Sequence, residues 1–76
     1  MIGAPIHVVP DDAFDDWIVR EDDGRELGHY PTRESAEVIG QAIARNRGGA
    51  LLIHLPDGRS QRESFERGWL SRLLAR

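Results

Sequence analysis

The chain has 76 residues, 39% hydrophobic and 30% charged, a composition typical of one small globular domain. It contains no cysteine, which excludes disulfides and thiolate metal sites. No apolar run approaches the ~20 residues of a membrane helix, and the N-terminus lacks a signal-peptide pattern. We therefore expect a cytoplasmic single domain over residues 1–76, with a core over 5–65 and a tail over 66–76, and no association with a membrane.

The net charge of −3 is distributed unevenly along the chain. Residues 1–24 contain seven acids and one arginine, whereas residues 25–76 contain nine arginines and six acids. The overall charge gives no general attraction to nucleic acid. All ten basic residues are arginine, which suits bidentate binding of phosphate or carboxylate.

The first 30 residues predict three strands. Residues 6–10 (IHVVP) are β-branched and short, which predicts a strand that ends at proline. The acidic residues 11–16 predict a loop, and residues 16–21 predict the second strand. Residues 22–24 (DDG) predict a hairpin turn that leads into a weaker edge strand over 25–30.

A helix is predicted to begin after Thr32 and to end near Arg45–Arg47. The hydroxyl of Thr32 can cap the first turn, where Glu34 places a favourable negative charge. Gly48 follows the last basic residues, which is typical of a helix C-terminus. One stripe is expected to face a sheet. Its members recur every three or four residues, with Val38 widening it: Ala36, Ile39, Ala42, Ile43 and Asn46.

The most apolar run, residues 50–55, predicts a central strand, and the polar residues 59–64 predict an edge strand. A short amphipathic helix is expected over 66–76. The elements follow a β-β-β-α-β-β order, and the tight turns between them favour an antiparallel sheet. We expect an α+β fold with the long helix on one face of that sheet. The other face stays open unless the tail or a second chain covers it.

Several segments together resemble the bacterial domain-of-unknown-function family 2188. They are IHVVP (6–10), WIVR (17–20), YPTRESAEVIGQAIARNRGG (30–49) and LLIHLPDGRSQRESF (51–65). Members of that family resemble this pattern of a histidine-containing first strand, a tryptophan strand, a threonine-led helix and a Val-His strand. This chain departs from it at Asp16, where glycine is usual, and at Phe65-Glu66, where Tyr-Gly is usual. The resemblance implies the fold and carries no activity.

The tail supports the first functional hypothesis, a non-enzymatic interaction module that forms a homodimer or binds another protein. Four apolar side chains share one side of the tail: Trp69, Leu70, Leu73 and Leu74. A helix of two or three turns is unstable alone and needs a surface on which to dock. That surface is either the open sheet face of the same chain or a partner, and both possibilities stay open.

The second hypothesis is a nucleic-acid-binding domain that uses the open sheet face. Arginine side chains would contact phosphates and aromatic side chains would stack on bases. The residues proposed for these roles are Arg20, Arg59, Arg62, Trp17 and Tyr30. The net negative charge opposes this hypothesis, and the acids over 11–16 would repel phosphate.

We expect no catalytic residues, no metal and no cofactor. The serines lie in no Gly-x-Ser-x-Gly elbow and the glycines form no phosphate loop. The histidines at positions 7, 29 and 54 each lie on a predicted strand, and the pattern leaves open whether they converge. The stretches LLIHLPDGR and ERGWLSRLLAR also resemble small mRNA interferase toxins, which implies His54 as a general acid or base. The Gly-Ser-His that such enzymes use is absent here.

Overall fold

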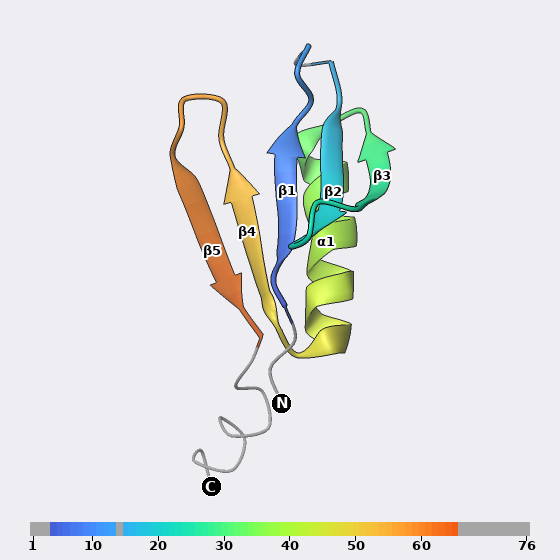
Figure 1. The fold of residues 1–76 in the computed structure, drawn as a ribbon, viewed down its shortest axis with the longest axis vertical. Coiled ribbons are helices and arrows are strands. Elements are labelled where there is room, and N and C mark those ends of the chain that lie inside the picture. Colours follow the sequence, from blue (N-terminus) through green and yellow to red (C-terminus); the bar gives the residue numbers. More distant parts are fainter. Residues whose placement is uncertain (1–3, 14, 66–76) are drawn as a thin grey trace, which may run out of the picture.

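A computed structural model describes residues 4–13 and 15–65 of the chain. Its elements follow the predicted order: β1 (Ile6–Pro10), β2 (Trp17–Glu21), β3 (Glu26–Tyr30), α1 (Arg33–Arg47), β4 (Ala50–His54) and β5 (Ser60–Ser64). The five strands form one sheet, and α1 lies across one face of it (Figure 1). The predicted α+β architecture with one long helix is therefore confirmed. The predicted C-terminal helix over 66–76 lies outside the described residues.

The prediction of a wholly antiparallel sheet is wrong. The strands lie in the spatial order β3-β2-β1-β4-β5, so β1 is the middle strand. β1 pairs with β4 in parallel, whereas the other three pairs are antiparallel. The tight turns fix only the hairpins β2–β3 and β4–β5. The helix carries the chain back across the sheet, and such a crossover inserts β4 beside β1 in the parallel direction.

Both hairpin turns depend on a glycine with a left-handed backbone. Gly24 has a φ of 96° and Gly58 a φ of 92°, a region that residues with a Cβ rarely adopt. In the second turn, Leu55 N–H donates to the carbonyl of Arg59 at 2.8 Å. The two turns therefore hold β2 against β3 and β4 against β5, and the β2–β3 register shifts between Val19 and Arg20.

The helix begins and ends where the sequence predicts. The hydroxyl oxygen of Thr32 accepts a hydrogen bond from the backbone N–H of Ser35 at 3.1 Å. At the other end, Gly48 adopts a left-handed conformation with a φ of 68°, and its N–H donates to the carbonyl of Arg45. Local capping chemistry thus sets both ends of α1.

The predicted sheet-facing stripe of α1 is partly wrong. The buried helix residues are Ala36, Gly40 and Ala44, whereas Ile39 is 36% exposed and Ala42 and Asn46 are exposed. Small residues dominate the contact because the helix lies close to the sheet. A Cβ added at Gly40 would lie 2.8 Å from Leu51 Cδ1 and 3.1 Å from Val8 Cγ2.

The core lies between α1 and the sheet. Its largest fully buried side chains come from β1, β2 and β4: Ile6, Val8, Val19, Leu51 and Ile53. Trp17 and Tyr30 pack against this core from its margin. Among the described residues, no helix is long and apolar enough to cross a membrane.

Candidate functional site

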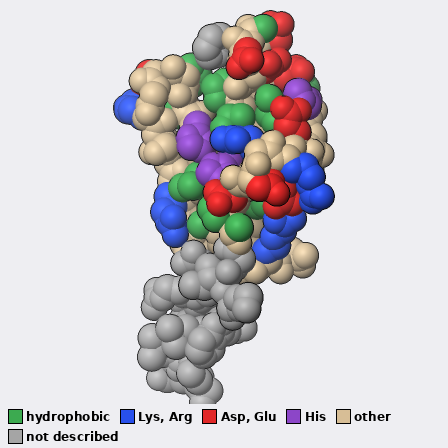
Figure 2. All heavy atoms as spheres, in the orientation of Figure 1, with side chains coloured by type: hydrophobic (Ala, Val, Ile, Leu, Met, Phe, Trp, Pro, Cys, Tyr) green, Lys and Arg blue, Asp and Glu red, His purple; other side chains and the backbone are tan. Residues whose placement is uncertain are grey.

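The sheet face opposite to α1 gathers polar side chains from three neighbouring strands. Ile6 and Val8 belong to the core beneath the helix, so alternation turns His7 to the opposite, open face. In the ladder, His7 lies directly across from Arg20 on β2 and from Leu52 on β4. The same alternation puts Arg20 and His54 on that face. Figure 2 views this side and shows adjacent histidine side chains near its centre, with a basic side chain against them.

His7 and His54 form the centre of this site. Nδ1 of His7 lies 2.9 Å from Nε2 of His54, within hydrogen-bonding distance, and the ring planes are 18° apart with centroids 5.2 Å apart, as in an edge-to-edge N–H···N bond. His7 is 9% exposed, so the pair is largely shielded on the β1 side. The two residues are 47 positions apart in the chain, and only the parallel pairing of β1 with β4 brings them together.

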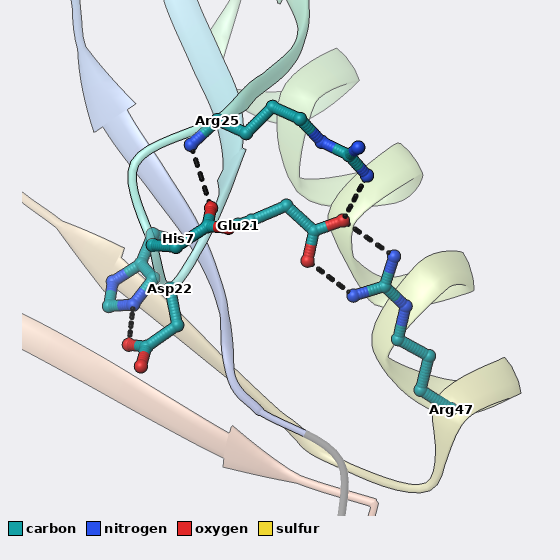
Figure 3. Close-up of polar contacts among 6 residues, drawn as sticks. His7, Glu21, Asp22, Arg25 and Arg47 are labelled. Carbon is teal, nitrogen blue, oxygen red and sulfur yellow. Dashed lines mark hydrogen bonds and ion pairs between the residues drawn. The ribbon is translucent and has the colours of Figure 1, made fainter.

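The carboxylate of Asp22 fixes which ring nitrogen of His7 carries the proton. Asp22 Oδ1 lies 2.9 Å from Nε2 of His7 (Figure 3). An ionised carboxylate only accepts hydrogen bonds, so Nε2 of His7 is the donor. In a neutral ring, Nδ1 of His7 is then the acceptor, and Nε2 of His54 donates to it. The three side chains thus form a directed chain of hydrogen bonds that ends at His54.

Arg20 contributes a positive charge beside the pair. Its Nε is buried and has no hydrogen-bond partner among the described residues. The pKa of His54 lies below its usual range because burial disfavours the imidazolium, and the charges of His7 and Arg20 act in the same direction. His54 is therefore held in its neutral form near pH 7.

The structure separates the five residues that the sequence proposed for nucleic-acid binding. Arg20 and Arg62 lie on the open face, since Arg62 is opposite Leu52 in the ladder. Arg59 lies in the β4–β5 turn, where it binds Asp57 through its Nε at 2.7 Å. The two aromatic residues, Trp17 and Tyr30, pack against the core on the helix side. The arginines on the open face therefore have neither of these aromatic side chains beside them.

His29 lies apart from the other two histidines, on the edge strand β3. Its Nε2 is 2.8 Å from Glu26 Oε1, and its Nδ1 is 3.7 Å from Asp16 Oδ2. The hydrogen bond with Glu26 raises the pKa of His29. Possible ligand atoms of Asp11, Asp16 and His29 lie within 4.8 Å of one another, a spacing that fits joint binding of one cation. These side chains are half-buried or exposed, and His29 already hydrogen-bonds to Glu26.

Sequence reasoning missed two features of the open-face site. It left open whether His7 and His54 share a sheet face, because the parallel β1–β4 contact is not encoded by any local pattern. It assigned Asp22 only to a turn, where aspartate is common for backbone reasons. The one available signal was that each histidine lies between β-branched or leucine residues on a predicted strand.

A family model matches residues 6–64, and it describes an uncharacterized protein conserved in bacteria, the domain-of-unknown-function family 2188. The chain belongs to this family. No curated protein and no solved structure matches this chain. The part matched to family 2188 contains the whole open-face site, from His7 to His54, whereas the tail over 66–76 lies beyond the match.

Proposed function

We propose that this member of family 2188 is a binding module whose open sheet face receives a ligand with a phosphate or sulfate-type anionic group. The observation that carries the proposal is the position of Arg20, which lies beside His7 with a buried, unpartnered Nε among the described residues. Because Arg20 as a whole is half-buried, its guanidinium can turn this unpartnered N–H donor towards an anion oxygen on the open face. Guanidinium and imidazole donors are also the groups that suit such oxygens.

The expected affinity of this site for an isolated anion is low. Two charge-assisted hydrogen bonds at roughly 2 kcal/mol each provide about 4 kcal/mol, which corresponds to a Kd of about 1 mM. Higher affinity requires further contacts from the remainder of the ligand. Arg62 on β5 shares the open face and lies two strands from His7, so it is a second cationic contact for a larger ligand.

The charge distribution favours a compact anion over a long polyanion. Figure 2 shows acidic side chains around the same face, and Asp22 pairs with His7 while Asp16 and Glu26 pair with His29. A nucleic acid that followed the whole sheet would meet these carboxylates. The second sequence hypothesis, nucleic-acid binding, therefore remains only in a restricted version, in which a single phosphate of the nucleic acid binds at Arg20.

Nuclear magnetic resonance titration of the full chain with inorganic phosphate at pH 7 tests the proposal, with sodium chloride added to matched ionic strength as the blank. We expect saturable shifts that centre on His7, Arg20 and His54 and that disappear in Arg20→Gln. Arg59→Gln is the matched control, because Arg59 is exposed and pairs with Asp57 in a turn. Shifts that persist unchanged in Arg20→Gln, or no saturable shift at all, would overturn the proposal.

A second candidate function is acid–base cleavage of RNA by His54. The observation that favours it is the chain Asp22–His7–His54, since the carboxylate orients His7, His7 accepts from Nε2 of His54, and Nδ1 of His54 is left available as a base. Incubation of the full chain with a fluorogenic RNA substrate tests this. Cleavage that is lost in His54→Gln would establish the activity, and intact RNA would leave binding as the function.

A further inference from the structure

The hydrogen bond between His7 and His54 limits how many protons the pair can hold. Nδ1 of His7 and Nε2 of His54 lie 2.9 Å apart, so one proton must lie between them. Two protons would place two N–H groups against each other, and none would place two lone pairs against each other. Because Asp22 keeps a proton on Nε2 of His7, the proton of the central bond comes from Nε2 of His54 in the neutral pair.

One ring nitrogen therefore remains able to take up a proton without breaking either bond. That atom is Nδ1 of His54, which has no hydrogen-bond partner among the described residues. Protonation there converts His54 to an imidazolium that still donates through Nε2 to His7. The new Nδ1–H group is an additional donor that carries positive charge on the open face.

We propose that binding of an anion to the open sheet face is coupled to the uptake of one proton from solvent at Nδ1 of His54. The inference rests on the proposed function, since it describes the regulation of the same site. The proton forms an N–H bond at His54 and no other covalent bond changes. Anion affinity therefore rises as the pH falls, and the site favours ligands in acidic conditions.

The groups that face His54 determine the direction of this coupling. The charged or titratable ones come from β1, from β2 and the turn after it, and from β5: His7, Arg20, Asp22 and Arg62. On β5, Ser60 lies directly opposite His54 and does not titrate. In the free protein, burial and the positive charge of Arg20 keep His54 neutral. An anion that offsets the charge of Arg20 weakens the electrostatic repulsion that a protonated His54 experiences. The bound anion therefore stabilises the imidazolium.

Sulfate is the appropriate probe because its charge stays constant between about pH 5.5 and 8, the range in which histidine side chains titrate. Any proton uptake then comes from the protein. Isothermal titration calorimetry of the full chain in buffers of different ionisation enthalpy measures protons taken up for each sulfate bound. We expect an uptake that approaches one proton and a Kd that rises by up to about tenfold for each pH unit. In parallel, sulfate should raise the pKa of His54 in an imidazole NMR titration.

Two variants separate the coupling from the binding. His54→Gln should keep weak sulfate binding through Arg20 but lose the proton uptake and the pH dependence of Kd. His29→Gln is the control, because His29 lies on β3 and bonds to Glu26, and it should retain both. Sulfate binding without proton uptake in the wild-type chain would overturn the coupling and leave the proposed function intact. Absence of sulfate and phosphate binding at every pH would overturn the proposed function as well.

Discussion

The carboxylate of Glu21, at the end of β2, accepts two hydrogen bonds from the guanidinium of Arg47 in the last turn of α1, at 2.6 and 2.8 Å. Arg25 adds a third at 3.1 Å, and the three side chains converge in Figure 3. The bonds from Arg47, supported by those from Arg25, lower the pKa of Glu21 from 4.5 to about 2. This contact ties the C-terminal end of the helix to the sheet, next to the turn that carries Asp22.

We predict that Glu21→Gln lowers the melting temperature by a few degrees and flattens its dependence on acid pH. The folded pKa of Glu21 lies below the unfolded value, so its contribution to stability is complete above pH 4.5 and is lost as the pH falls towards 2. Thermal unfolding followed by circular dichroism between pH 2 and 7 measures this. Asp12→Asn is the control, since Asp12 is an exposed loop residue. The prediction fails if both variants follow the wild-type curve.

The close approach of α1 to the sheet predicts that Gly40→Ala destabilises the domain. Alanine at a helix position normally gains about 1 kcal/mol over glycine. Here the added methyl would meet Leu51 and Val8 in a fully buried core, and overpacking costs about 1–3 kcal/mol. We expect a net loss of about 1 kcal/mol in urea unfolding. A stability gain would show that the helix can shift outward freely.

A matched substitution on the opposite side of the helix tests the reason for that loss. Ala42 is exposed, so Ala42→Gly changes helix propensity without touching the core. It should lose about 1 kcal/mol through propensity alone. If Gly40→Ala and Ala42→Gly moved stability in opposite directions, propensity alone would account for both.

Local signals in the sequence predict the elements of this fold well. The bounds of β1 are confirmed to the residue, and Thr32 and Gly48 mark the ends of α1, because each depends on chemistry within a few positions. Hydropathy misled the assignment of the contact stripe. Ile39 is more apolar than Gly40, yet the helix approaches the sheet through its smallest side chains.

The open-face site could not be predicted because it depends on strand pairing between distant segments. Either hairpin can be inferred from its turn, but no turn connects β1 with β4. Without that pair, His7 and His54 are two unrelated strand residues. The position of Asp22 beside His7 likewise follows from the antiparallel β1–β2 register, which brings the end of β2 near the start of β1.

The two histidine environments predict opposite contributions to stability around pH 6.5. The pKa of His54 is lowered, so its contribution is present above pH 6.5 and is lost as the pH falls through its folded pKa. The pKa of His29 is raised, so its contribution is present below pH 6.5 and is lost as the pH rises through its folded pKa. The pH dependence of the unfolding free energy of the wild-type protein therefore shows only the difference between the two contributions.

Comparison of His54→Gln with His29→Gln resolves these effects. Between pH 5 and 8, we expect the loss of stability on acidification to be smaller in His54→Gln than in wild type. In His29→Gln the loss on acidification should be larger. Urea unfolding followed by tryptophan fluorescence measures both, since Trp17 packs against the core. Variants with identical pH profiles would contradict the opposite environments of the two rings.

The tail over 66–76 lies outside the described residues, so the homodimer that it suggests remains a prediction with its own test. Four apolar side chains on one side of an 11-residue segment need a docking surface, since so short a helix is marginal alone. We expect light scattering to give a dimer for the full chain and a monomer for Leu73→Asp. Ser71→Asp adds the same charge to the polar side of the tail and should remain dimeric.

An apolar interface should also persist as salt rises, unlike a phosphate contact. A full chain that is monomeric, and whose melting temperature falls in Leu73→Asp alone, would instead show that the tail docks on its own domain.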